Sequence, residues 1–194
     1  MKRLLDFFLA FCGFLLLFPF LIIISLLIAM DSRGSVIYKQ RRVGRQNRDF
    51  TILKFRTMKI NSDKEGLLTI GSDERITAIG KWMRKYKIDE IPQLINILKG
   101  EMSIVGPRPE VRKYVDLYSE EEKRVLSVRP GLTDYASILY MNESEILAES
   151  ENPEQKYMEE IMPHKLKLNL KYIDNQSIIL DLRIIFSTIG RILK

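Results

Sequence analysis

The chain has 194 residues, with 31 Lys and Arg against 25 Asp and Glu, and carries a formal net charge of +6. That length suits one domain with a core plus a small appendage. The basic excess suits an anionic partner, such as nucleic acid, anionic lipid or a phosphate-rich substrate. The single cysteine, Cys12, excludes an intramolecular disulfide and favours a reducing compartment.

The single histidine, His164, leaves no Cys/His cluster that could hold zinc and few places for a Ser-His-Asp relay. We expect His164 to be structural or solvent-facing. Roles of acid, base and nucleophile therefore fall to carboxylates.

Residues 7–30, FFLAFCGFLLLFPFLIIISLLIAM, contain no charged side chain. As a helix this stretch would be about 36 Å long, against a hydrocarbon core of about 30 Å. It has no A-x-A-like cleavage site and is longer than the apolar region of a signal peptide, so it predicts a membrane anchor. Pro19 removes a backbone hydrogen bond in its middle and favours a kink at Phe18 and Pro19.

Both flanks of this apolar segment are basic. Lys2 and Arg3 precede it, and six Lys and Arg side chains follow it within residues 33–48. The positive-inside rule favours the cytoplasm for both flanks, which a helix that enters and leaves on one face would satisfy. Proline kinks also occur in helices that span the bilayer, so the residues by themselves leave both topologies open.

The next segments alternate between strand and helix patterns. Residues 34–40 and 49–58 predict short strands around a basic turn, residues 59–74 a loop, and residues 75–88 an amphipathic helix. Asp89 fits the N-cap of a further helix over residues 90–99, with Pro92 in its first turn and Gly100 at its end.

The second half of the chain is mostly helical by pattern. Residues 101–110 are expected to be extended because of Pro107 and Pro109, residues 110–128 to form one or two helices capped by Ser119, and residues 129–135 to form a turn. An unassigned stretch to about residue 152, a helix pair broken at Pro163 and a final helix over residues 177–194 follow. That last helix places Ile178, Leu182, Ile185 and Ile189 on one face, for the core or alternatively for a membrane interface.

Asp89 and Glu90 are flanked by basic motifs. Lys54 and Arg56 share one face of a strand, and Arg108 projects from a proline-stiffened segment. A basic run of Arg84, Lys85 and Lys87 lies just before the acidic pair. Arginine binds phosphate oxygens with two nitrogens, and cations around a carboxylate lower its pKa. An ionised Asp can attack phosphorus, and a neighbouring carboxylate can help to hold Mg²⁺.

Five segments together resemble the bacterial sugar transferases, the monotopic polyprenyl-phosphate phosphoglycosyl transferases. They are DFFLAFCGFLLLFPF, GSVIYKQRRVG, ILKFRTM, KIDEIPQLINILKGEMSIVGPRPE and RPGLTDYASI, in the same order and at similar spacing. The resemblance covers nearly the whole chain and matches the minimal form of the family. It implies an α+β, mostly helical fold with a re-entrant membrane helix (1–32), a cytosolic catalytic domain (33–194), a small β element and amphipathic interfacial helices.

The resemblance also implies an activity. Members transfer a sugar 1-phosphate from a UDP-sugar to undecaprenyl phosphate with release of UMP, using Mg²⁺ and a covalent phosphosugar-aspartate intermediate. By this resemblance Asp89 is the nucleophile, Asp89 and Glu90 are the metal ligands, and five basic residues surround the phosphates: Lys54, Arg56, Arg84, Arg108 and Arg129. The implied location is the cytoplasmic face of the bacterial inner membrane, in glycoconjugate or exopolysaccharide assembly, with lipid as a further partner and a homodimer left open.

Two departures from the family pattern concern specificity. Asp134 and Tyr135 stand where members often have Gly and Trp, and Asn169 stands where many have Asp. The sequence also allows two other functions. A membrane-tethered nucleic-acid-binding protein would have aromatic residues among the basic ones, which the turn at residues 41–48 lacks. In a non-catalytic membrane scaffold, Asp89 would only cap a helix.

Overall fold

The computed structural model describes residues 1–60, 62, 66 and 68–193. Helices dominate it and the strands are few and short, which confirms the α+β, mostly helical class. In chain order the elements are α1 (Lys2–Asp31), β1 (Ile37–Val43), η1 (Arg45–Asn47), β2 (Asp49–Phe55), α2 (Ala78–Lys85), η3 (Ile88–Glu90), α3 (Gln93–Lys99), β3 (Ser103–Val105), α4 (Arg112–Val115), η4 (Glu122–Ser127), β4 (Gly131–Thr133), α5 (Tyr135–Leu139), α6 (Glu143–Ala148), α7 (Pro153–Lys156), the π-helical turn η5 (Tyr157–Ile161), α8 (Met162–Asp174) and α9 (Ile178–Ile192).

The predicted strands form an antiparallel hairpin of β1 and β2, in which Tyr38 pairs with Lys54. This confirms the two strands, although β1 extends three residues further than the pattern indicated and β2 ends earlier. Residues 61, 63–65 and 67 of the predicted loop lie outside the described residues. The predicted helix over residues 75–88 is shorter, because the Thr77 side chain accepts a hydrogen bond from Gly80 N and caps it there.

A second pair of strands is present, of which only β3 lies in a segment expected to be extended, residues 101–110. Residues 129–135 were expected to be a turn, but β4 lies parallel to β3, and Ser103 pairs with Gly131. The two segments approach so closely that a Cβ on Gly131 would lie 2.1 Å from the nitrogen of Gly106. Only glycine permits this contact, which fixes the segment carrying Arg108 against the start of α5.

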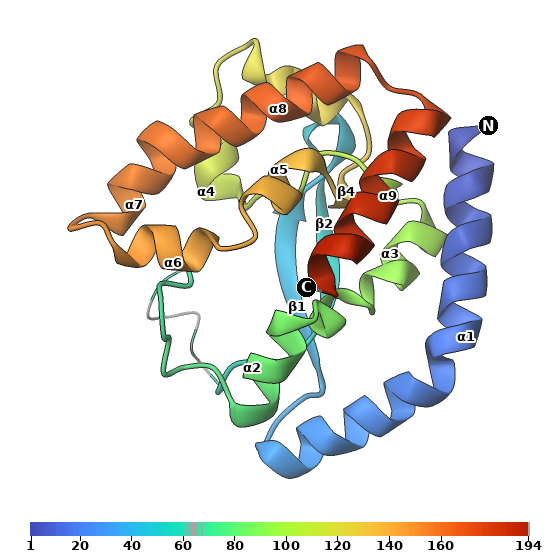
Figure 1. The fold of residues 1–194 in the computed structure, drawn as a ribbon, viewed down its shortest axis with the longest axis vertical. Helices are drawn as coiled ribbons and strands as arrows, with labels where there is room; N and C mark the ends of the chain where they lie inside the picture. The colour runs from blue at the N-terminus through green and yellow to red at the C-terminus, as the bar shows by residue number, and fades with distance from the viewer. Residues whose placement is uncertain (61, 63–65, 67, 194) are drawn as a thin grey trace.

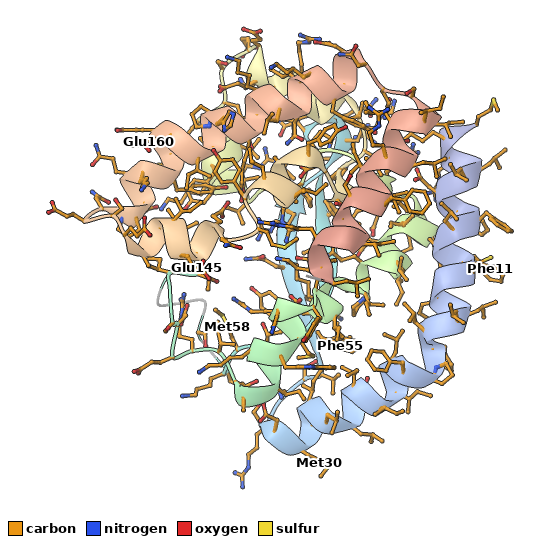
Figure 2. The ribbon with its side chains drawn as sticks, in the orientation of Figure 1. Phe11, Met30, Phe55, Met58, Glu145 and Glu160 are labelled. Carbon is orange, nitrogen blue, oxygen red and sulfur yellow. The ribbon has the colours of Figure 1, made fainter. Side chains whose placement is uncertain are left out.

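The N-terminal helix α1 bends around one side of the molecule, running beside α3 and α9 and then below α2 (Figure 1). Pro19 lies inside α1, at the position where the sequence predicts a kink at Phe18 and Pro19. Its outer side carries exposed apolar side chains, including Phe11 and Met30 (Figure 2). The helix is long and apolar enough to cross a membrane, and only 11% of its most apolar stretch is buried. These properties indicate membrane association.

Both ends of α1 are bound to the same folded unit. At the start, Lys2 pairs with buried Asp181 of α9 at 2.5 Å, and the Asp6 carboxylate accepts hydrogen bonds from Ser103 Oγ and Ile104 N. At the end, Arg56 donates to the carbonyl oxygen of Ser32 at 2.6 Å. Both ends of the apolar helix therefore contact the same folded domain.

The C-terminal helices differ from the sequence expectation in two ways. The chain is not broken at Pro163, because η5 and α8 continue one another and the proline, the second residue of α8, directly follows the wider π-helical turn. In α9 the buried face carries Asp181 and Ile184. Of the four expected core residues, Ile185 packs against the core, whereas Ile178, Leu182 and Ile189 are 36%, 38% and 49% exposed. The exposure of that face favours the alternative of an interfacial helix.

Candidate active site

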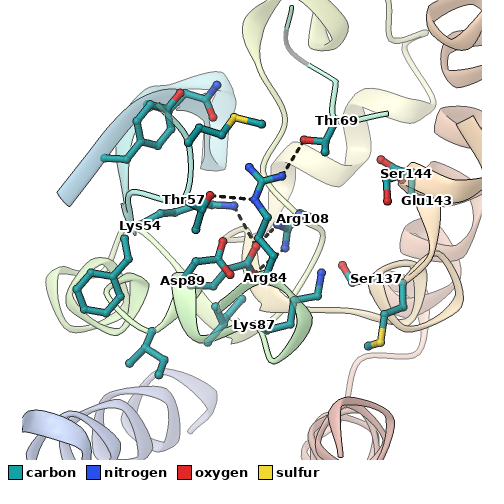
Figure 3. A pocket seen from close by; sticks show the side chains of 18 of the residues that line it. Lys54, Thr57, Thr69, Arg84, Lys87, Asp89, Arg108, Ser137, Glu143 and Ser144 are labelled. Carbon is teal, nitrogen blue, oxygen red and sulfur yellow. Dashed lines mark hydrogen bonds and ion pairs between the residues drawn. The ribbon is translucent and has the colours of Figure 1, made fainter. Parts of the chain in front are cut away.

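A cavity of about 1290 Å³ lies between the hairpin, α2, α5, α6 and α9. Its lining includes Asp89 and Glu90 together with four cationic side chains that surround them: Lys54, Arg84, Lys87 and Arg108. Figure 3 shows these side chains converging from separate elements. The structure thus brings together both predicted carboxylates and three of the five predicted phosphate-binding residues.

Glu90 is the anchor of this cluster. Lys54 Nζ lies 3.0 Å from Glu90 Oε1, and Arg108 Nη1 lies 3.1 Å from Glu90 Oε2, with Arg108 Nη2 bonded to the other oxygen. Burial alone would raise the pKa of Glu90, but Arg108 and Lys54 hold that pKa well below its usual range. Glu90 is therefore ionised, and both its oxygens are occupied.

Asp89 has the opposite environment. It is 7% exposed, and its buried Oδ1 has no hydrogen-bond partner among the described residues. Burial and the neighbouring Glu90 raise the pKa of Asp89, against the opposing charges of Lys54 and Arg84. The expectation of a lowered pKa for Asp89 is therefore wrong, because Glu90 takes the ion pairs that Asp89 was expected to make.

The turn that carries Asp89 is also not the one expected. Asp89 lies in the short helix η3, before α3 begins. The N-cap residue of α3 is Pro92, and no side chain forms a capping hydrogen bond there. Asp89 is thus not a helix cap, which removes the basis of the scaffold interpretation for this residue. A buried carboxylate oxygen without a partner costs folding free energy and has no structural role here that we can identify.

Arg84 reaches the cavity from α2. Its Nε donates to Thr57 Oγ1 at 2.9 Å and its Nη1 to Thr69 Oγ1 at 3.0 Å (Figure 3). The helix can lie this close because Gly80 has no side chain, and a Cβ there would lie 2.2 Å from the carbonyl oxygen of Thr57. Since its partners are neutral, the positive charge of Arg84 stays available for an anion.

The structure places the other two predicted phosphate-binding residues elsewhere. Arg56 lines the cavity, but its guanidinium donates to the carbonyl oxygens of Ser32 and Arg33 at the end of α1, at 2.6 and 2.8 Å. Arg129 donates to the carbonyl oxygen of Gly100 at 2.8 Å, after the last turn of α3. Both arginines therefore satisfy helix-terminal carbonyl groups and are not directed at Asp89.

One of the unusual residues adjoins the site. Asp134 is 1% exposed, and its Oδ2 accepts a hydrogen bond of 2.9 Å from the backbone N–H of Arg108. Its other oxygen caps α5. Asp134 therefore joins the Arg108 segment to α5, a role that the sequence comparison with family motifs could not indicate. The other departure, Asn169, is buried in α8, and its Oδ1 has no partner.

The oxygen atoms of Asp89 and Glu90 limit how a metal ion could be bound at this site. No group of three or more His, Cys, Asp or Glu side chains gathers within the described part of the chain. The free Oδ1 of Asp89 is a hard oxygen ligand of the kind Mg²⁺ prefers. Because both Glu90 oxygens are bound by cations, these residues fit an Mg²⁺ that takes most of its ligands from substrate phosphates and water.

His164 and Cys12 both lie at the surface of the protein. His164 is exposed and bonded through Nδ1 to the Tyr140 hydroxyl at 2.6 Å, away from Asp89, and Cys12 is exposed on α1. The cluster thus has one buried carboxylate available as a nucleophile, a second held in ion pairs, and positive charge around both. Such a constellation can bind a phosphorylated substrate and attack it.

Fold and site define a membrane-associated protein with a buried Asp-Glu pair surrounded by cationic side chains in a cavity. The model of the family described as "Bacterial sugar transferase" matches residues 1–194, and the chain belongs to that family.

Relatives differ in how much of their length the chain covers. It is 35% identical over 198 residues to the exopolysaccharide production protein PSS of Rhizobium leguminosarum bv. phaseoli, covering 97% of this chain and 93% of that protein. It is 37% identical to the UDP-N-acetylgalactosamine-undecaprenyl-phosphate N-acetylgalactosaminephosphotransferase of Aeromonas hydrophila, covering 99% of this chain and 43% of that protein. It is 39% identical to the undecaprenyl-phosphate glucose phosphotransferase of Komagataeibacter xylinus, covering 91% and 33%. The chain thus spans less than half of the last two proteins.

Proposed function

We propose that the protein transfers a sugar 1-phosphate from a UDP-sugar to undecaprenyl phosphate, giving undecaprenyl-diphospho-sugar and UMP. Family membership and the names of the relatives from Aeromonas and Komagataeibacter support the reaction class. The observation that carries the proposal is the buried Asp89, which lies in a cavity lined by cations and whose Oδ1 has no partner among the residues that the structure describes.

The first step uses Asp89 as nucleophile. An oxygen of its carboxylate attacks the phosphorus that bears the sugar, and the bond from that phosphorus to the bridging oxygen of the diphosphate breaks. The bridging oxygen leaves with UMP, and the sugar phosphate stays on Asp89 as an acyl phosphate. The absence of a salt bridge to Asp89 favours this step, because a paired carboxylate would be a weaker nucleophile.

The second step returns the enzyme to its starting state. A phosphate oxygen of undecaprenyl phosphate attacks the same phosphorus, and the bond to the Asp89 oxygen breaks. The product is the diphosphate-linked lipid sugar, and Asp89 is again a free carboxylate. Glu90 contributes indirectly by holding Lys54 and Arg108 beside the reacting phosphorus.

Cations stabilise the charge that develops on the phosphate oxygens. Arg84 has neutral partners and is assigned to the donor, while Lys54 and Arg108 are paired with Glu90. Mg²⁺, which we propose as the cofactor, would take Asp89 Oδ1 as a ligand and would neutralise the diphosphate when bound. Glu90 would join it only after releasing one of its cations.

The membrane arrangement follows from the two ends of α1. Lys2 and Asp6 bind α9 and β3 at one end, while Arg56 binds Ser32 and Arg33 at the other. A straight span would separate those ends across the bilayer. We therefore propose that α1 enters and leaves on the cytoplasmic face, bent near Pro19, and that the exposed face of α9 lies at the same interface.

A panel of UDP-sugars tests the proposed activity. Each sugar is incubated with undecaprenyl phosphate, the full chain in detergent and Mg²⁺, and UMP release is measured. We expect one or a few donors to give rapid release, EDTA to stop it and added Mg²⁺ to restore it. Release of no UMP from any donor would contradict the proposal.

A further inference from the structure

The turn between α2 and η3 has an unusual residue at its centre. Lys87 has φ +54 and ψ +22, and its N–H donates to the carbonyl oxygen of Arg84 at 3.2 Å as α2 ends. A left-handed residue after a helix is usually glycine, since a Cβ strains that conformation. A lysine at this position therefore has a conformational cost that a glycine would not have.

The Lys87 side chain extends into the catalytic cavity. It is half-buried, lines the cavity and points into the space that Asp89 and Arg108 face (Figure 3). Among the described residues, no carboxylate lies within ion-pair distance of its ammonium group, and no hydrogen bond to its side chain is found. A cation at this depth without a partner is ready to bind an anion.

The charges around Asp89 are not balanced within the protein. Four cations act on it electrostatically, namely Lys54, Arg84, Lys87 and Arg108, against the two carboxylates Asp89 and Glu90. Lys54 and Arg108 are paired with Glu90. Of these four cations, Arg84 and Lys87 are the two that form no ion pair with a carboxylate among the described residues, and two such cations match the two charged phosphates of a nucleotide-sugar diphosphate.

We propose that Lys87 is a binding residue for the diphosphate of the nucleotide donor, acting together with Arg84 on the two phosphates. This inference rests on the proposed function for the identity of the donor. The lipid acceptor also brings a phosphate, but a single phosphate would leave one of the two cations without a partner. A donor diphosphate engages both.

The variant Lys87→Gly removes the lysine side chain and preserves the backbone turn. Glycine adopts the left-handed conformation without strain, so this variant should fold and its thermal unfolding midpoint should rise slightly. Gln46 is a matched control, because it is exposed, has φ +57 and lies outside the cavity. Gln46→Gly should give a similar rise in midpoint and leave ligand binding unchanged.

The test is calorimetric titration of the full chain in detergent, in metal-free buffer. Inorganic diphosphate is titrated into the wild type, Lys87→Gly, Lys87→Arg and Gln46→Gly, and undecaprenyl phosphate in mixed micelles is titrated into the same proteins. We expect the Kd for diphosphate to rise tenfold or more in Lys87→Gly and to recover substantially in Lys87→Arg, with undecaprenyl phosphate affected less than threefold.

Three results would overturn the assignment. Unchanged diphosphate binding in Lys87→Gly would make Lys87 a helix-terminating residue only. Weakened binding of undecaprenyl phosphate with normal diphosphate binding would assign Lys87 to the acceptor. A lowered unfolding midpoint with equal loss of both ligands would show a structural role. None of these results depends on turnover by the enzyme. If no UDP-sugar released UMP, that would contradict the proposed function, but the comparison of diphosphate binding among the variants would still be valid.

Discussion

Arg108 binds Glu90 through both terminal nitrogens, with Nη1 3.1 Å from Oε2, while the adjacent Asp89 receives no such bond. Two neighbouring carboxylates in one turn thus have opposite environments. Cations lower the pKa of Glu90, while burial and the charge of Glu90 raise that of Asp89. The ion pair of Glu90 leaves Asp89 free for nucleophilic attack.

Replacing Asp89 by Asn should separate catalysis from folding. UMP release should fall by about a thousandfold or more, because the amide cannot form the acyl phosphate. The unfolding midpoint should stay the same or rise, since the change removes a buried charge that has no hydrogen-bond partner at Oδ1. Thermal unfolding and a UMP-release assay on one preparation measure both. A large fall in midpoint would indicate that Asp89 is structural.

Glu90→Gln should destabilise the protein by about 2–3 kcal/mol at neutral pH, because Lys54 and Arg108 lose their counter-charge. The folded-state pKa of Glu90 is below its ordinary value of 4.5, so its stabilising contribution is complete above that value. The contribution is lost as pH falls toward the lower folded pKa. Unfolding midpoints of wild type and variant should therefore differ at pH 7 and converge below about pH 4. A difference independent of pH would contradict this.

Arg56 and Arg84 should respond differently to truncation, although both were predicted to bind phosphate. Arg84→Ala should raise the donor KM about tenfold or more, because the guanidinium faces the cavity with neutral partners. Arg56→Ala should instead cost about 2 kcal/mol of stability, since it removes hydrogen bonds to Ser32 and Arg33. Steady-state kinetics and unfolding of both variants check this. A raised donor KM in Arg56→Ala without destabilisation would indicate that Arg56 binds phosphate, as the sequence predicted.

The membrane arrangement can be tested with single cysteines in a Cys12→Ser background. Cysteines at Lys2 and Ser35 should both resist an impermeant thiol reagent added to intact cells, because both ends of α1 contact one domain. Labelling at Lys2 alone would contradict the re-entrant arrangement. Pro19→Ala should straighten the helix and lower activity without altering any group in the cavity.

Strong local patterns predicted the hairpin, the helix ended by Gly100, the bent apolar segment and the Asp89–Glu90 pair. The parallel pair of β3 and β4 was missed because each strand has three residues, and Gly131 with its flanking proline is typical of a turn. Their pairing depends on contact between segments nearly thirty residues apart, which periodicity does not report.

The candidate site was predictable in its residue types but not in its pairings. Arg56 follows Lys54 by two residues, yet the strand ends at Phe55 and Arg56 turns toward the end of α1. The pKa of Asp89 could not be inferred from neighbouring basic residues, because Glu90 takes the nearest ones. Lys87 was noted only as part of a basic run, since its left-handed conformation is a property of the turn.

The central claim is that Asp89 carries the sugar phosphate between the two substrates. The direct measurement is an intact-mass spectrum of the protein after incubation with an accepted UDP-sugar and Mg²⁺ in the absence of undecaprenyl phosphate. We expect a mass increase of one sugar phosphate, located on Asp89 by peptide mapping and absent from Asp89→Asn. An unmodified protein, under conditions where added acceptor gives rapid turnover, would contradict it.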